Sequence, residues 1–175
     1  MADTQKIIAK EASALPGETA LIPVYMSNTI QVGKILMHLR DTPNVFTLFE
    51  EPYTDANNNS EWDSTEIYED TNGDGMWTGM VTFSDRVTGS WTKTITEFNG
   101  RVMVIMTNWN TPIQADTTLL MKINVLVDST ASPGAVVLDF PTLGLKALED
   151  ESYMTSSGSG EDFIISQEAS TEDEL

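Results

Sequence analysis

The stretch Val32-Gly33-Lys34-Ile35-Leu36-Met37-His38-Leu39-Arg40 follows a period of two. Successive side chains of a β-strand point to opposite faces, so every second residue shares a face. One face, expected to point into a core, carries Gly33, Ile35, Met37 and Leu39. The other face carries Lys34, Leu36, His38 and Arg40. The stretch therefore predicts a strand of a sheet that is buried on one side.

Similar short apolar runs, separated by Gly, Pro, Asn or Asp, fill most of the chain, and no long segment has a helical period. The predicted strands are Gln5–Ala9, Glu18–Ser27, Val32–Arg40, Val45–Phe49, Trp77–Ser84, Trp91–Phe98, Arg101–Thr107, Thr117–Val127, Ala135–Phe140, Leu143–Leu148 and Asp162–Ser166. We interpret Ser156–Gly160 as a flexible segment and residues 168–175 as an acidic, disordered tail. The pattern predicts an all-β protein, a β-sandwich of the jelly-roll type.

The chain has 175 residues, of which 40% are hydrophobic, and a net charge of −18. This size and composition predict one domain with its own core. The negative charge argues against nucleic acid and anionic membrane surfaces as partners. No apolar run is long enough for a membrane helix, and the first residues lack the apolar centre of a signal peptide. The segment could therefore be excised from an extracellular protein.

The outward face of the strand at 32–40 is basic, although the whole chain has only nine Lys and Arg residues and one His. Two interpretations are open. An amphipathic strand exposes polar residues to solvent without further purpose. Alternatively, Lys34, His38 and Arg40 around Leu36 form a basic area on an acidic protein, where a partner binds.

Two oxygen-rich patterns follow each other between Asp55 and Val81. Asp70, Asn72 and Asp74, followed by Gly75, form D-x-N-x-D-G, the first half of a calcium loop, with the carbonyl of Met76 as a further ligand. The twelfth position, which should be Glu, is Val81. The first pattern does have its Glu but has Ser60 where Gly belongs; its candidate ligands are Asp55, Asn57, Asn59, Asp63 and Glu66.

Calcium fits these two patterns better than other metals, because they offer only hard oxygen ligands and the chain has no Cys. The alternative is a solvated acidic loop, since Asp, Asn and Gly are also the residues of ordinary turns.

Two of the four tryptophans lie within the acidic stretch from Asp55 to Val81 and two lie after it: Trp62, Trp77, Trp91 and Trp109. Exposed aromatic rings stack on sugars, so these residues are candidates for a carbohydrate site, with Tyr53 and Tyr68 close by. The alternative is that they fill the core and cover the acidic stretch.

Three segments resemble a cohesin domain, the module that receives dockerins in cellulosome-type assemblies. Pro16–Thr19 with Leu21–Tyr25 resembles the family's opening loop and second strand. Leu39–Phe46 resembles its strand ending in Tyr-Asp-Pro-x-Val-Leu, and Leu120–Gly134 its later strand and Ser-rich turn. The resemblance implies a jelly roll of about nine strands in an extracellular or cell-surface protein, related to carbohydrate-binding modules. It also implies a dockerin-like partner on the sheet that holds the strand at 32–40.

The chain departs from this family in two ways. Lys34 and Leu36 stand where family members often use Asn and Asp, and an insertion at about residues 50–98 carries the calcium patterns. We therefore predict one cohesin-like domain over residues 1–167, without catalytic activity, that binds a protein partner and is stabilised by calcium. A calcium-dependent carbohydrate-binding module, or a structural surface module, is the alternative. His38 is the only imidazole and lies on the outward strand face, which disfavours an enzyme.

Overall fold

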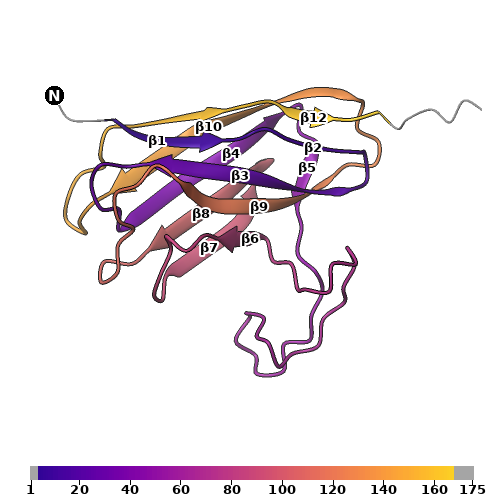
Figure 1. The fold of residues 1–175 in the computed structure, drawn as a ribbon, viewed down its shortest axis with the longest axis horizontal. Helices are drawn as coiled ribbons and strands as arrows, with labels where there is room; N and C mark the ends of the chain where they lie inside the picture. Colours follow the sequence, from indigo (N-terminus) through magenta and orange to yellow (C-terminus); the bar gives the residue numbers. More distant parts are fainter. Residues whose placement is uncertain (1–3, 168–175) are drawn as a thin grey trace, which may run out of the picture.

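A computed structural model describes residues 4–167, which form two β-sheets packed face to face (Figure 1). The strands are β1 (Gln5–Ala9), β2 (Ala12–Ala14), β3 (Thr19–Ser27), β4 (Lys34–Thr42), β5 (Phe46–Leu48), β6 (Val81–Phe83), β7 (Thr92–Phe98), β8 (Arg101–Thr107), β9 (Leu119–Val127), β10 (Gly134–Lys146), β11 (Ser156–Gly160) and β12 (Phe163–Ile165). The first sheet has the order β11-β1-β3-β9-β5, and β6 also pairs with β9. The second sheet has the order β2-β12-β10-β4-β8-β7. The prediction of an all-β jelly-roll sandwich is confirmed.

The core lies between the sheets and is built from every second residue of the long strands. On β4, Ile35, Met37 and Leu39 are buried, while the side chains between them face outward. Met121, Ile123, Val125 and Val127 supply the facing surface from β9. Asn124, which the strand pattern predicts to face solvent, is 1% exposed because the insertion covers it and its Nδ2 donates to the carbonyl of Gly79.

Three of the predicted strands differ from the structure. Residues 135–140 and 143–148 were predicted as two strands, but they belong to one long strand, β10, whose register shifts between Asp139 and Thr142. The strand predicted at Trp77–Ser84 shortens to β6, because the residues before Val81 belong to the insertion. Within residues 4–167 there is no helix, and hence none that could span a membrane.

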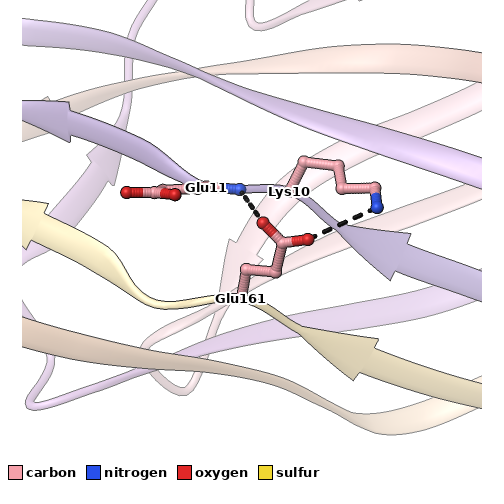
Figure 2. Close-up of polar contacts among 3 residues, drawn as sticks. All are labelled: Lys10, Glu11 and Glu161. Carbon is pink, nitrogen blue, oxygen red and sulfur yellow. Dashed lines mark hydrogen bonds and ion pairs between the residues drawn. The ribbon is translucent and has the colours of Figure 1, made fainter.

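Ser156–Gly160 was predicted to be flexible but is strand β11, paired in parallel with β1. Its small residues allow β10 to approach closely: a Cβ added at Gly160 would lie 2.2 Å from the carbonyl oxygen of Leu138. Just after β11, Glu161 fixes the turn between β1 and β2 (Figure 2). Its carboxylate accepts hydrogen bonds from Lys10 Nζ at 3.3 Å and from the Glu11 amide at 3.0 Å. The predicted tail at 168–175 lies outside the described residues.

Between β5 and β6 the chain leaves the sandwich as a long excursion that projects from one end of it (Figure 1). Its two ends are anchored on β9: the Phe49 amide donates to the carbonyl of Asn124, and the Asn124 amide donates to that of Met80. The excursion is therefore fixed to the first sheet at both of its ends.

Candidate functional sites

The excursion is an internal duplication with an offset of fifteen residues. Glu51-Pro52-Tyr53-Thr54-Asp55-Ala56-Asn57 aligns with Glu66-Ile67-Tyr68-Glu69-Asp70-Thr71-Asn72, in the frame E-x-Y-x-D-x-N. The match continues through Asn59 and Asp74, Ser60 and Gly75, and Trp62 and Trp77. The two predicted calcium patterns are thus two copies of one unit, which we call the first loop (residues 55–66) and the second loop (residues 70–81).

The opening aspartate of each loop organises its backbone in the same way. Asp55 accepts hydrogen bonds from the amides of Asn59 at 3.1 Å and Ser60 at 2.8 Å. Asp70 accepts them from the amides of Asp74 at 3.1 Å and Gly75 at 2.8 Å, and also from Gly73. Both loops therefore curl around their first carboxylate.

Each loop is closed by a glutamate that bonds the amides at its second and ninth positions. In the first loop, Glu66 accepts from Ala56 at 2.8 Å and from Asp63 at 3.1 Å. In the second loop the same two positions are Thr71 and Thr78.

The residue that bonds these two positions of the second loop is Glu51, which comes before the first loop. Its carboxylate accepts from the Thr71 amide at 3.0 Å and from the Thr78 amide at 2.7 Å, and it is fully buried. Glu51 therefore takes the place of the glutamate that is missing at Val81. Glu51 was not among the ligands predicted from the sequence, although the fifteen-residue repeat would have revealed it.

The two copies are related by a local two-fold arrangement. Tyr53 and Tyr68 form an antiparallel bridge, flanked by hydrogen bonds of 2.8 Å from Thr54 to Ile67 and from Glu69 to Pro52. Burial, followed by the nearby carboxylates, raises the pKa of both tyrosines.

The tryptophans follow the same symmetry. Trp62 and Trp77 stack with ring centroids 5.0 Å apart. Tyr53 meets the edge of Trp77 at 5.8 Å, and Tyr68 meets that of Trp62 at 5.9 Å. The duplication is thus a small folded unit with an aromatic centre.

Three carboxylates of the second loop converge: Glu51, Asp70 and Asp74 each offer an oxygen within 4.8 Å of the others. The side-chain oxygen of Asn72 bonds the Asp74 amide at 3.2 Å. In the first loop, Asp63 is already engaged, because it accepts from Asn57 Nδ2 at 2.9 Å and from Thr65. The hydrogen bonds from Thr65 lower the pKa of Asp63.

No Lys, Arg or His occurs in the sequence between Arg40 and Arg86, so no basic side chain of this segment balances the acidic loops. Carboxylate and amide oxygens are the ligands that calcium prefers.

Only two of the four tryptophans lie together in a hollow. Trp62 and Trp77 line a cleft of about 370 Å³ with Phe83, Lys93 and Ile95. Trp91 is 7% exposed and belongs to the core, so its predicted role in sugar binding is wrong. Trp109 packs over Gly33, where an added Cβ would lie 2.4 Å from its ring. The carbohydrate site stays a prediction, for which Trp62 and Trp77 are the two tryptophans that share a cleft.

Lys34, Leu36, His38 and Arg40 share the outward face of β4, as predicted, and β4 lies between β10 and β8 in the second sheet. Their cross-strand neighbours are Arg101, Met103, Ile105 and Thr107 on β8, and Asp139, Thr142, Gly144 and Lys146 on β10. Leu36 lies opposite Ile105, and His38 opposite Met103. Phe98, on β7, is 53% exposed and its ring lies 6.1 Å from that of His38. The face therefore has an apolar centre.

Basic side chains surround this apolar centre. Lys34 and Lys146 place their ammonium groups 5.8 and 5.3 Å from the ring of Tyr153, which lies over Gly144. Arg40 donates two hydrogen bonds to Asp139 and is therefore less available to a partner than predicted. Burial, followed by the charge of Arg101, lowers the pKa of His38. We call Lys34, Leu36, His38, Arg40, Phe98, Arg101, Met103, Ile105, Lys146 and Tyr153 the basic sheet face.

Comparison with solved structures shows that the chain has the cohesin fold. The solution structure of CaCohA2 from Clostridium acetobutylicum matches with a TM-score of 0.63 and 21% identity, over 96% of this chain and 94% of that one. CaCohA2 in its crystallised complex with a variant of CaDoc0917 matches with a TM-score of 0.61 and 22% identity, over 93% and 100%.

A non-cellulosomal cohesin from the archaeon Archaeoglobus fulgidus matches with a TM-score of 0.60 and 18% identity, over 94% and 93% of the two chains. No family model and no curated protein sequence matches the chain. The resemblance seen in the three sequence segments is thus confirmed at the level of the fold.

Proposed function

We propose that the chain is a non-catalytic, cohesin-like module that binds a dockerin-type protein through the basic sheet face. The observation that carries the proposal is the gathering of four of the nine Lys and Arg residues around an apolar centre: Lys34, Arg40, Arg101 and Lys146. The proposal is supported by the cohesin fold and by the complex that CaCohA2 forms with the CaDoc0917 variant. The same resemblance favours an extracellular or cell-surface setting.

The basic sheet face indicates the chemistry of the partner. Leu36, Met103 and Ile105 are half-buried and Phe98 is exposed, so they can be covered by an apolar patch. Lys34 and Lys146 lie at one end of this patch and Arg101 at the other. We therefore expect a partner with an apolar centre and acidic side chains on both sides, because complementary charge fixes register and accelerates association.

The test uses a panel of purified dockerins that includes CaDoc0917, with binding measured by calorimetry. Leu36→Asp should weaken any observed binding at least tenfold, because it places a charge at the centre of the contact. The matched control is Leu21→Asp, since Leu21 is exposed on β3 of the opposite sheet. Charge reversal at Lys34 should weaken binding less and mainly slow association. Equal effects of the two leucine variants would overturn the assignment of the face.

We further propose that the duplicated insertion binds calcium, with Glu51, Asp70, Asn72 and Asp74 in the second loop and Asp55, Asn57, Asn59, Asp63 and Glu66 in the first. Met76 adds its carbonyl to the second set. The position of Glu51 supports the proposal, because it gives the incomplete second loop its closing carboxylate. A cation would offset the repulsion among these carboxylates.

Calcium that binds only the folded chain should raise the free energy of unfolding by about 2.7 kcal/mol at a hundredfold excess over Kd, and so raise the melting temperature. Chelator should lower it and allow proteolysis between Tyr53 and Trp77. Magnesium at the same concentration serves as the control, since it requires stricter octahedral geometry. Absence of heat on titration with calcium, together with an unchanged melt, would exclude the site.

A further inference from the structure

Strand β7 forms a long, open edge of the second sheet. Within residues 4–167 it pairs only with β8, and all of its residues are exposed except Ile95, which is half-buried. The other end strands are shorter: β2, β5 and β6 have three residues each and β11 has five, against seven in β7. Unpaired edges of this length are surfaces to which another strand can add.

The turn after β7 determines which backbone groups point outward. Asn99 and Gly100 both have positive φ, 50° and 72°, as in the type I′ turn of a two-residue hairpin. Phe98 and Arg101, which flank this turn, therefore form a hydrogen-bonded pair, and such pairs alternate along the hairpin.

By this alternation the amides and carbonyls of Lys93, Ile95 and Glu97 point away from β8. Among residues 4–167, no loop donates a main-chain hydrogen bond to these three residues or accepts one from them.

The sequence of β7, Thr-Lys-Thr-Ile-Thr-Glu-Phe, places opposite charges at equal distances from its central isoleucine. If a second copy pairs antiparallel with Ile95 opposite Ile95, Lys93 of each copy lies opposite Glu97 of the other. Registers centred on Lys93 or on Glu97 would instead place like charges opposite each other, which is unfavourable. Among the registers centred on Lys93, Ile95 and Glu97, charge therefore favours the one centred on Ile95.

We propose that this edge pairs with the β7 edge of a second copy of the chain, in the antiparallel register centred on Ile95. Each of the two side chains also has a contact within its own chain: the Lys93 ammonium lies 4.8 Å from the centre of the Phe83 ring, and Glu97 accepts a hydrogen bond from the Leu48 amide. Both residues are exposed. The dimer is weak and depends on concentration, because an edge contact is small and both copies carry a charge of −18.

Two antiparallel strands that pair edge to edge are related by a two-fold axis perpendicular to the sheet. The second sheet of one copy would therefore continue into the second sheet of the other, with the outward faces of both copies on the same side. The outward residues of β7, including Phe98, continue the basic sheet face. Two such faces would then lie side by side and could bind a bivalent partner. This consequence rests on the proposed function, whereas the dimer itself does not.

The experiment is sedimentation equilibrium of the chain at up to about 1 mM, the weak end of measurable affinity. The wild type should show a reversible dimer. Lys93→Glu places Glu opposite Glu97 and should abolish it, and Glu97→Lys should do the same with two lysines. An equimolar mixture of these two variants restores both opposite-charge pairs and should dimerise again.

Lys6→Glu is the matched control for net charge, since Lys6 is exposed on β1 in the other sheet. It should leave the dimer intact, and circular dichroism should show that every variant is folded. A monomeric wild type, or a mixture that associates no more than its components, would overturn the proposal. The result does not depend on whether any dockerin binds.

Discussion

The first and second loops of the insertion share the same hydrogen-bond pattern but differ in the residues at corresponding positions. Both are closed by a glutamate that bonds the amides at positions two and nine. The second loop places Gly73 and Gly75 at its left-handed positions, whereas the first uses Asn58 and Ser60 at φ of 57° and 62°. The second loop also has Asp74 where the first has Asn59. The hydrogen-bond frame therefore holds the geometry, and we expect the placement of the carboxylates and the backbone freedom to set how well each copy binds a cation.

The largest effect should come from the closing glutamate of the second loop. Glu51→Gln replaces one acceptor oxygen by an NH2 group facing a backbone amide in a fully buried site. A buried donor without a partner costs about 1–3 kcal/mol, and we expect this loss of unfolding free energy even in chelator.

Glu50→Gln is the matched control, because Glu50 is the exposed neighbour and undergoes the same chemical change. Chemical denaturation with and without calcium measures both variants. If they were equally stable, the Glu51 carboxylate would not be what holds the second loop closed.

Each loop offers three carboxylates, and those of the second loop converge, so we expect the second loop to bind calcium about tenfold more tightly than the first. Glu51, Asp70 and Asp74 converge in the second loop, while Asp63 of the first is held by Asn57 and Thr65. Calorimetry should therefore show two steps, with the tighter one lost in Asp70→Asn and the weaker one in Asp55→Asn. Loss of the same step in both variants would mean that the two loops share one ion.

Backbone conformation gives the next difference. A left-handed residue other than glycine costs about 1–2 kcal/mol, of which the greater chain entropy of glycine offsets about half. Ser60→Gly should therefore stabilise the first loop by up to about 1 kcal/mol. Gly75→Ser should destabilise the second by a similar amount, and the cost is purely conformational because an added Cβ at Gly75 meets nothing within 4 Å. Thermal melts in chelator measure both; changes of the same sign would contradict this account.

The sandwich could be predicted from the sequence because alternation on strands such as β4 is a local signal. Strand β11 could not, since its Ser and Gly residues have low strand propensity and it is held by the close approach of β10. The basic sheet face was only partly predicted: Lys34 and Leu36 share a strand, but Met103, Ile105 and Tyr153 join them through strand order and a distant loop.

The insertion shows another limit of a linear interpretation. A calcium loop is normally read forward from its first aspartate, so Val81 at the twelfth position of the second loop suggested an incomplete site. The closing residue, Glu51, instead precedes that aspartate by nineteen residues. From the sequence, the role of Glu51 can be inferred only by aligning the two copies of the repeat.

The smallest difference between the copies lies in their tryptophans, and it is measurable because the rings are stacked and related by the local symmetry. Trp77 donates its Nε1 hydrogen to the carbonyl of Glu51 at 3.1 Å. The corresponding Nε1 of Trp62 is buried and, in the part of the chain that the structure describes, has no hydrogen-bond partner.

Replacing Trp77 by Phe removes a hydrogen bond worth about 0.5–1.5 kcal/mol and leaves the Glu51 carbonyl without that donor, whereas Trp62→Phe removes a buried donor that has no partner to lose. Both variants lose the same ring area, so this common loss cancels in the comparison. Trp77→Phe should therefore be less stable than Trp62→Phe by about 1 kcal/mol, as measured by denaturation in chelator. The reverse order would mean that Trp62, in the copy with the weaker loop, anchors the aromatic centre of the insertion.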